Sequence, residues 1–331
     1  MTALRQTTGA PGARILGVGA YEPGRVVDNA ELCSLIDSSD EWIRQRTGIV
    51  ERRWAGEDES LLAMTATAAR RALDHAGMAP ADIDAVLVTT VTRLVQFPAL
   101  AVELAAELGC GPAAAWDVSA ACAGFGYALA QADALVRAGT ARHVLVVAGD
   151  RLTDLTDFHD RATAFLFADG AGAAVVGPWE RPGVGPVVWG SDGAQKDVLR
   201  QTLSWDAAAA KGQPPFIAMD GQKVFKWALT DVAEVTRRAI AAAGLEPEQI
   251  DLFVPHQAND RITDALLRQL RLPADVVVAR HIRQTGNTSS SSIPIGVARL
   301  YHDGLVAPGA TCLMVGFGAG LVFAGQVVIL P

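Results

Sequence analysis

The sequence contains few cysteines, few aromatic residues and little charge. Only 4 of its 331 residues are cysteine, and no CxxC pair or other metal-ligand spacing joins them. In a chain of this size such cysteines are typical of reduced thiols, so the sequence predicts neither a disulfide framework nor a metal site. Charged residues make up 19% of the chain and the net charge is −8, which argues against a general nucleic-acid binder.

Long apolar runs are missing as well. Residues 1–12 are small and polar, and they lack the apolar core of a secretory signal. No uninterrupted apolar stretch reaches the ~18–20 residues that a membrane span requires. We therefore expect a soluble, cytoplasmic protein. Because 50% of the residues are hydrophobic, we also expect a large buried core.

What the sequence does contain is an alternation of strand-like apolar runs with helical patterns. This alternation predicts an α/β fold whose sheets are covered on both faces. Strands are expected at residues 13–18, 85–89, 113–118, 144–148, 172–176, 252–255, 276–279, 311–315 and 324–330. Helices are expected at residues 58–76, 99–108, 124–137, 223–243, 260–270 and 294–302.

One segment of the first half returns in the second half. Residues 70–84 (RRALDHAGMAPADID) and 237–251 (RRAIAAAGLEPEQID) lie 167 positions apart and share a helix end, a glycine, a proline and a strand start. Their glycines, Gly77 and Gly244, are predicted helix C-caps. The repeat indicates a duplicated α/β unit with two domains, residues 13–177 and 186–331. They would join at the Pro- and Gly-rich stretch between them.

Cys122 is the candidate nucleophile. It follows a strand-like segment and directly precedes a helix-like one, among alanines and glycines that leave room for a substrate. A thiol at a helix N-terminus sits at the positive end of the peptide dipoles, which favours the thiolate, the form that attacks carbonyl groups. The usual role of an isolated cysteine is core packing, and that role requires neither the helix end nor the room.

Two further residues could act with such a thiol. His256 ends an apolar run and could line a site, although a histidine that only closes a strand fits the pattern equally well. Asn287 lies in a small-residue turn, where an ordinary turn asparagine is the simpler interpretation. The 167-residue offset carries Cys122 to position 289 in this same turn, so a thiol, an imidazole and an amide would converge. The remaining histidines are expected at the surface: His75, His143, His159, His281 and His302.

Three blocks of sequence resemble those of one enzyme family. Residues 119–125 (SAACAGF), 254–259 (VPHQAN) and 286–289 (GNTS) look like the motifs of β-ketoacyl-acyl-carrier-protein synthase III, the priming condensing enzyme of the thiolase superfamily. The similarity runs from Arg14 to Pro331, and the chain is also similar to the starter-unit ketosynthases of aromatic polyketide pathways. The resemblance implies a duplicated five-layer α/β/α/β/α fold and a homodimer.

The resemblance also implies a reaction. Cys122 would take an acyl group from coenzyme A as a thioester. His256 and Asn287 would donate hydrogen bonds to the thioester oxygen of malonyl-acyl-carrier protein, stabilising the enolate left when carbon dioxide leaves. The enolate would attack the acyl-cysteine, whose oxyanion the backbone N–H groups of Cys122 and Ala319 would hold. Glycine is usual in the family where Ala319 stands. No cofactor is implied beyond the coenzyme A thioester, which is a substrate.

Four residues match the family's coenzyme A site. Trp42, Arg46 and Arg161 match positions that hold the nucleotide end, and a tryptophan face and guanidinium groups suit adenine and phosphate. Asn259 matches a position that lines the pantetheine tunnel. Taken singly, the two arginines would be assigned to the solvated surface and Trp42 to the core.

Four more residues match the family's protein contacts. Lys226, Arg261 and Arg268 match a basic patch that receives the acidic carrier protein. Phe97 matches a residue that reaches into the partner's acyl pocket in the family's dimer. A phenylalanine would shorten that pocket, which implies a short starter, from acetyl to a small branched acyl group. Without the resemblance, Phe97 would be assigned to core packing.

Other functions stay open at this stage. A thiolase-fold acyltransferase would pass the acyl group to an alcohol or amine without condensation. A non-catalytic paralogue would only dock the carrier protein and would form no adduct on Cys122. A degradative thiolase needs a second cysteine in the last glycine-rich motif, whereas Cys312 lies in a predicted strand. Fatty-acid and polyketide initiation use the same three catalytic groups, so the motifs do not separate them.

Overall fold

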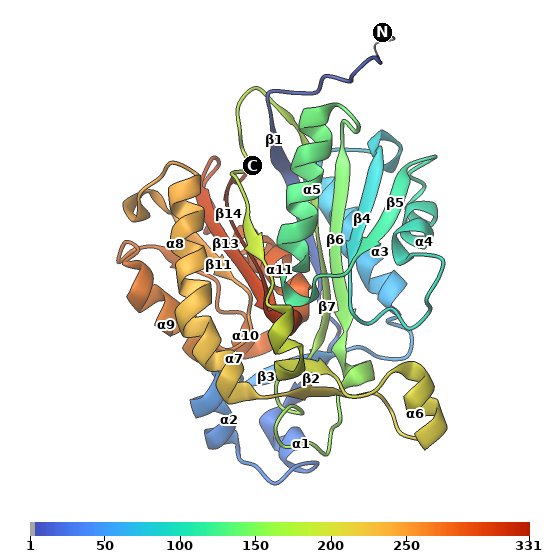
Figure 1. Cartoon of the computed structure of the whole chain (residues 1–331), viewed down its shortest axis with the longest axis vertical. Coiled ribbons are helices and arrows are strands. Elements are labelled where there is room, and N and C mark those ends of the chain that lie inside the picture. Colours follow the sequence, from blue (N-terminus) through green and yellow to red (C-terminus); the bar gives the residue numbers. More distant parts are fainter. Residues whose placement is uncertain (1–3) are drawn as a thin grey trace.

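Two five-stranded sheets form the centre of the molecule (Figure 1). The computed structural model describes residues 4–331, so the first three residues of the polar N-terminal stretch lie outside it. The first sheet contains β1 (Gly12–Tyr21), β4 (Ala85–Thr89), β5 (Ala114–Val118), β6 (Val144–Arg151) and β7 (Asp169–Trp179). The second contains β8 (Val188–Gly190), β11 (Leu252–Pro255), β12 (Val277–Val278), β13 (Thr311–Gly318) and β14 (Val322–Ile329).

The two sheets have the same strand order and the same strand directions. The first runs β1-β7-β6-β4-β5, and the second runs β8-β14-β13-β11-β12. In the first, β4 pairs in parallel with β5 and β6, while β7 is antiparallel to β6 and β1. In the second, β11 pairs in parallel with β12 and β13, while β14 is antiparallel to β13 and β8. The duplication predicted from the repeat is therefore confirmed.

Helices complete five layers. Helices α5 (Gly124–Ala138) and α11 (Ser292–His302) contribute to the core between the sheets (Figure 1). The outer face of the first sheet packs against α3 (Leu61–Ala76) and α4 (Leu100–Leu108). The outer face of the second packs against α8 (Ala233–Ala242) and α9 (Asp260–Leu270). This is the predicted α/β/α/β/α arrangement.

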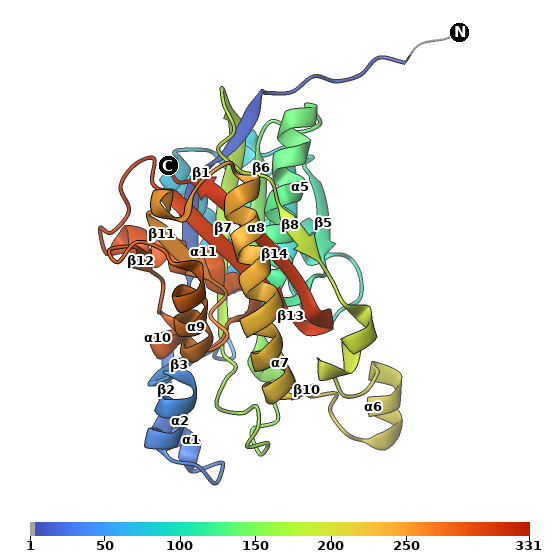
Figure 2. The same ribbon diagram turned by 60° about the vertical axis from the view of Figure 1, so that its left-hand side comes forward.

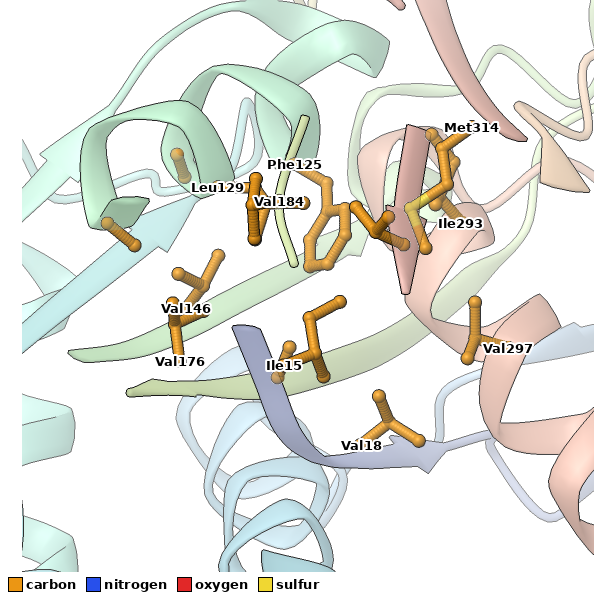
Figure 3. Packing of buried hydrophobic residues seen from close by; sticks show 14 of the residues in the cluster. Ile15, Val18, Phe125, Leu129, Val146, Val176, Val184, Ile293, Val297 and Met314 are labelled. Atoms are coloured by element: carbon orange, nitrogen blue, oxygen red, sulfur yellow. The ribbon is translucent and has the colours of Figure 1, made fainter. Parts of the chain in front are cut away.

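One apolar core joins the two halves. Phe125 and Leu129 of α5 lie in the same cluster as Ile293 and Val297 of α11, together with strand residues from both sheets (Figure 3). Phe125 is 1% exposed, so its replacement by alanine would destabilise the fold by about 3–5 kcal/mol. Val184, from the segment that connects the sheets, belongs to this cluster as well. The domain limits 13–177 and 186–331 stay predictions.

The repeated helix ends have the expected conformation. Gly77 has φ 63° at the end of α3, and Gly244 has φ 72° just after α8, so both turn the chain in the left-handed region that glycine tolerates. The long helix predicted at residues 223–243 consists of α7 (Gly221–Trp227), a π-helical stretch and α8.

Several short elements were not predicted, because their sequences are too short and too polar to show a period. Near one end of the molecule lie α1 (Asn29–Cys33) and α2 (Asp40–Thr47), with α6 (Trp205–Lys211) also near that end (Figure 2). The other short elements that were not predicted are β2 (Arg25–Asp28), β3 (Glu51–Trp54), β8 (Val188–Gly190), β9 (Leu199–Gln201), β10 (Ile217–Met219) and α10 (Ile282–Thr285). Among residues 4–331, no helix has the length and apolar character needed to cross a membrane.

Candidate active site

Cys122 lies in a tight turn between β5 and α5. Ala121, the residue before it, has φ 42°, a left-handed conformation that non-glycine residues seldom adopt. Residues 121–123 then form a single 3₁₀ turn that leads into α5. Such strained turns persist only where the surrounding structure fixes them, and they cluster at functional sites. The predicted setting at a strand-to-helix junction is therefore present.

Two glycines of β13 make room for this turn. A Cβ atom on Gly316 would lie 2.9 Å from the Cys122 carbonyl oxygen. One on Gly318 would lie 2.9 Å from the Cβ of Cys122 and 3.0 Å from its Sγ. A side chain at position 318 would displace the thiol, and one at position 316 would displace the backbone of the turn. The glycine-rich end of β13 thus serves close packing against the nucleophile.

The thiol is protonated at rest. Burial raises the pKa of Cys122 to about 12, and the Ser289 hydroxyl, 3.6 Å from Sγ, opposes this rise only in part. The sequence suggested a thiolate favoured by the helix dipole, and desolvation opposes that effect. Cys122 therefore has to lose its proton during attack on a substrate.

His256 is a neutral imidazole just after β11. It is 2% exposed, and burial lowers its pKa to about 3. Its Nδ1 lies 2.8 Å from the Ser292 hydroxyl, which already accepts the N–H of Gln257 at 3.1 Å. The hydroxyl hydrogen is therefore available to Nδ1, and the ring proton then lies on Nε2. In this state His256 offers an uncharged hydrogen-bond donor.

Asn287 is fixed by its own turn. Its backbone N–H donates to the carbonyl of Leu166, and its carbonyl accepts from Ala168, both at 2.9 Å. The side-chain Oδ1 accepts the Ser289 N–H at 2.9 Å, which leaves the amide NH₂ as the donor end.

Ser289 links all three predicted catalytic residues. Its hydroxyl contacts Cys122 Sγ, and its N–H binds Asn287 Oδ1. Its carbonyl raises the pKa of His256, against the larger effect of burial. The structure therefore brings Cys122, His256 and Asn287 around one residue. Sequence reasoning reached Ser289 only through the repeat offset and gave it no role.

Ala319 opens a short 3₁₀ segment directly after Gly318. Positive φ angles occur at Gly320 and Leu321 but not at Ala319. An alanine in place of the family's glycine is thus free of left-handed strain at that position. Whether its N–H serves an oxyanion stays a prediction.

The residues predicted to bind the nucleotide end of coenzyme A lie together. The guanidinium groups of Arg46 and Arg161 lie 5.6 Å and 5.2 Å from the centroid of the Trp42 ring. Phe165 packs edge-on against the same ring at 5.2 Å. Asn259 caps α9, and its amide donates to the Arg46 carbonyl at 3.0 Å. The flat Trp42 ring suits an adenine base, and the two guanidinium groups beside it suit phosphate. The roles of these four residues stay predictions.

The three predicted docking residues are exposed. Lys226 lies on α7, and Arg261 and Arg268 lie on α9. The Arg261 guanidinium lies 5.1 Å from the centroid of Phe225, the neighbour of Lys226. None of the three forms an ion pair with residues 4–331. They form a surface of uncompensated positive charge.

One expectation is wrong. His281 is 7% exposed, not at the surface, and burial lowers its pKa to about 3. Its ring lies under α11 because Gly296 has no side chain, and a Cβ there would lie 2.8 Å from His281 Cε1. The charged neighbour Arg280 suggested exposure, but its guanidinium turns away to Asp260 and Asp264. The predicted strand position of Cys312 is confirmed in β13.

Comparison with known proteins identifies the same family throughout. Residues 116–193 match the family described as 3-oxoacyl-[acyl-carrier-protein (ACP)] synthase III, and residues 240–330 match its C-terminal part. The chain is 50% identical to β-ketoacyl-[acyl-carrier-protein] synthase III 1 of Streptomyces coelicolor, with both chains covered in full. It is also 50% identical to the mycobacterial β-ketoacyl-[acyl-carrier-protein] synthase III of Mycobacterium tuberculosis, covering 100% of this chain and 99% of that one.

Solved structures agree with these relatives. The priming β-ketosynthase of the R1128 polyketide pathway superimposes with a TM-score of 0.97 at 49% identity, covering 100% of this chain and 99% of that one. The 3-oxoacyl-[acyl-carrier-protein] synthase III of Aquifex aeolicus gives a TM-score of 0.89 at 37% identity, covering 96% of this chain and 100% of that one. Both the sequence and the fold are thus similar over the whole chain.

Proposed function

Because this chain belongs to the 3-oxoacyl-[acyl-carrier-protein] synthase III family, we propose that it catalyses an acyl-CoA-primed, decarboxylative Claisen condensation with malonyl-acyl-carrier protein. The products would be a β-ketoacyl-carrier protein, coenzyme A and carbon dioxide. The observation that carries the proposal is the arrangement of Cys122, His256 and Asn287 around Ser289. The reaction would initiate fatty-acid or polyketide synthesis in the cytoplasm.

In the first step Cys122 would attack the thioester carbon of an acyl-CoA. The carbonyl oxygen would become an oxyanion near the backbone N–H groups of Cys122 and Ala319, which are neutral donors fixed in position by the fold. Coenzyme A would leave as the oxyanion collapses. The acyl group would remain on Sγ as a thioester.

In the second step His256 and Asn287 would act on the malonyl thioester. The Nε2–H of His256 and the NH₂ group of Asn287 would donate to its oxygen, where negative charge develops as carbon dioxide leaves. A charged imidazolium could give its proton away, whereas a ring whose pKa is about 3 stays neutral and only donates a hydrogen bond. The enolate carbon would then attack the acyl-Cys122 carbonyl. The chemistry would use only groups of the chain and its two thioester substrates.

Two surfaces would bind these substrates. Trp42, Arg46 and Arg161 would hold the nucleotide end of coenzyme A, and Asn259 would lie along the pantetheine arm. The second surface would receive the acidic carrier protein through exposed cations that have no ion-pair partner in residues 4–331. These are Lys226, Arg261 and Arg268.

The protein would act as a homodimer. Strand β5 forms an edge of the first sheet. In the loop between β4 and α4, Leu94 and Val95 are each 52% exposed and Phe97 is 80% exposed. An open strand edge beside exposed apolar side chains is typical of a surface that a second copy covers. Phe97 would then enter the partner's acyl pocket and shorten it. We therefore propose a short starter, from acetyl to a small branched acyl group.

The test is intact-protein mass spectrometry with a panel of acyl-CoA donors, followed by malonyl-carrier protein. We expect one acyl adduct, absent in Cys122→Ala, and carbon dioxide release on addition of the carrier protein. An adduct without carbon dioxide release would favour acyl transfer to an alcohol or amine. Absence of any adduct would favour a docking paralogue.

The same assay tests Phe97. Phe97→Ala should extend the adducts to longer acyl groups, because the substitution would remove an aromatic ring from the partner's pocket. Val102→Ala is a matched control, since Val102 is also an exposed apolar residue of this region. An unchanged chain-length preference in Phe97→Ala would contradict the proposed position of this residue.

A further inference from the structure

Asp150 is a buried carboxylate that the proposed reaction leaves without a role. It lies near the end of β6 and is 0% exposed. Its Oδ1 accepts three hydrogen bonds, from the Val91 N–H at 2.7 Å and from the hydroxyls of Thr90 at 2.9 Å and Thr92 at 3.1 Å. Its Oδ2 has no hydrogen-bond partner among residues 4–331. A buried carboxylate oxygen without a partner is costly, so its retention calls for an explanation.

The Ser289 hydroxyl connects this carboxylate with the nucleophile. It lies 3.6 Å from Cys122 Sγ. It also lowers the pKa of Asp150, which burial raises, and the turn of residues 289–291 packs against β6, although Ser289 and Asp150 complete no hydrogen bond at rest. The backbone of Ser289 is fixed by its φ of 57° and by its N–H to Asn287 Oδ1.

We propose that Asp150 accepts the Cys122 proton through the Ser289 hydroxyl during acyl transfer from coenzyme A, a step that rests on the function proposed above. As Sγ bonds to the thioester carbon, its proton passes to Ser289 Oγ, and the Ser289 proton passes to Asp150 Oδ2. As the tetrahedral oxyanion collapses, the electron pair of the breaking C–S bond goes to the coenzyme A sulfur. That sulfur takes a proton back from Ser289, and Asp150 returns to the carboxylate.

The number of charges that would lie buried in the site favours Asp150 as the proton acceptor over solvent or His256. A thiolate formed beside an ionised Asp150 would place two negative charges in one buried site, and Asp150 indeed adds to the raised pKa of Cys122. In the relay the negative charge moves from the carboxylate toward the reacting atoms without increasing. Transfer to His256 would create a buried imidazolium, which desolvation opposes. Ser289 is thus a catalytic residue of the first step, and Asp150 is a positioning and proton-accepting residue behind it.

The experiment measures acetylation of Cys122 by acetyl-CoA with rapid quenching and intact-protein mass spectrometry. Ser289→Ala and Asp150→Asn should both acetylate on the order of 100-fold more slowly than wild type at pH 7, because each interrupts the relay. Ser290→Ala is the matched control. It removes the neighbouring buried hydroxyl, whose side-chain contact is with Thr89 and not with the thiol, and it should leave the rate within about threefold.

Two further readouts separate a relay from a structural role. Once acetylated by long incubation, both variants should release carbon dioxide from malonyl-carrier protein at rates within about threefold of wild type, since decarboxylation precedes the return of a proton to Sγ. The acetylation rate of Asp150→Asn should also rise about tenfold per pH unit above neutrality, because attack then depends on free thiolate. The wild-type rate should depend less steeply on pH there, because the relay carries the thiol proton away during attack.

Several outcomes overturn the relay. One is that Asp150→Asn or Ser289→Ala is acetylated at the wild-type rate at pH 7. Another is an equal loss of both steps in these variants, which would indicate a structural role. If His256→Ala is acetylated slowly while Asp150→Asn is acetylated at the wild-type rate, the imidazole is the proton acceptor. If wild type itself takes no acetyl group from coenzyme A, the proposed function fails, and the relay fails with it.

Discussion

The two strand-to-helix turns of this chain have nearly the same backbone and different chemistry. In the first half, Ala121 has φ 42° and the next residue is the nucleophile, Cys122. In the second half, Ser289 has φ 57° and the next residue is Ser290, so these turns match at an offset of 168, one more than the repeat predicted, and Ser290 is the counterpart of Cys122. Each turn forms one 3₁₀ turn and leads into a central helix. The comparison separates what the backbone determines, which is a rigid turn at the sheet interface, from what the side chain determines, which is reactivity.

The strand ends that face these turns differ in the same way. Thr89 ends β4, while the matching position after β11 holds His256. In the first half a Cβ on Gly124 would lie 1.8 Å from Thr89 Oγ1, so glycine is required there. In the second half Ser292 stands at the start of α11 and its hydroxyl meets His256. The first half thus supplies the nucleophile, and the second supplies two neutral donors.

Exchanging the nucleophile between the turns should give the largest effect. Cys122→Ser should lower acylation by at least about 10³-fold, because a serine hydroxyl is a far weaker nucleophile than a thiol. Adding Ser290→Cys to that variant places a thiol at the matching position of the second turn. We expect no acyl adduct on it in intact-protein mass spectra. An adduct would show that the two turns are chemically equivalent.

Removing the donors of the second half should give the next effect. His256→Ala and Asn287→Ala should each lower carbon dioxide release by about 10²–10³-fold, or about 2.7–4 kcal/mol, while the acyl adduct on Cys122 still forms. Acyl-adduct formation and carbon dioxide release are measured separately on the same samples. A variant that lost the adduct and kept decarboxylation would reverse the assignment of steps to halves.

Filling the glycine of the first half should affect stability. Gly124→Ala should lower the free energy of unfolding by about 2 kcal/mol, because its Cβ would overlap the Thr89 side chain. Thr89→Ala in the same chain should recover part of this loss, since it removes the overlapping group. Denaturant unfolding of the two single variants and the double variant provides the coupling free energy. Simple additivity would mean that the strain lies elsewhere.

The smallest predicted effect is a difference in the pH dependence of the two halves. The pKa of His281 in the second half is lowered to about 3, so its folded form binds fewer protons than the unfolded chain and stability falls as pH drops below 6.5. Burial raises the pKa of Asp169 in the first half to about 6, so its contribution is present at low pH and is lost as pH rises through that value.

Neutral substitutions should therefore change the pH slope in opposite directions. The unfolding free energy of wild type should fall by about 1–2 kcal/mol between pH 7 and pH 5 because of His281, and His281→Gln should remove this loss. Over the same range, Asp169→Asn should remove a gain of about 1 kcal/mol in unfolding free energy. The measurement is the slope of the unfolding free energy against pH for each variant. A change in stability that is the same at every pH does not alter this slope. Equal slopes in both variants would contradict the comparison.

The sequence was sufficient for the frame of the fold. Strands such as 85–89 and helices such as 99–108 have clear apolar periods, and the repeat required the same order of elements in both halves. It was not sufficient for β2 and β3, which consist of four residues each, contain charged residues and pair antiparallel with helices α1 and α2 between them in the chain. Such short strands depend on packing from distant segments, and no local period reveals that packing.

The site could be located from the sequence, but its surroundings could not. Cys122, His256 and Asn287 lie in recognisable blocks of the sequence. The role of Ser289 depends on a contact across 167 positions, and Asp150 is a single acid at the end of an apolar strand. His281 was misjudged because its charged neighbours point to partners elsewhere in space. Burial of one residue among exposed neighbours is set by tertiary packing, which a linear pattern does not record.

The connection between the halves has a consequence for how such a site could arise. Two half-length chains related by a two-fold axis would carry identical turns, so every substitution would appear twice. One continuous chain, with Val184 of the linking segment packed into the shared core, lets one turn keep a thiol while its counterpart changes to serine. Covalent fusion of the two copies therefore permits the loss of symmetry that a division of labour between nucleophile and donors requires.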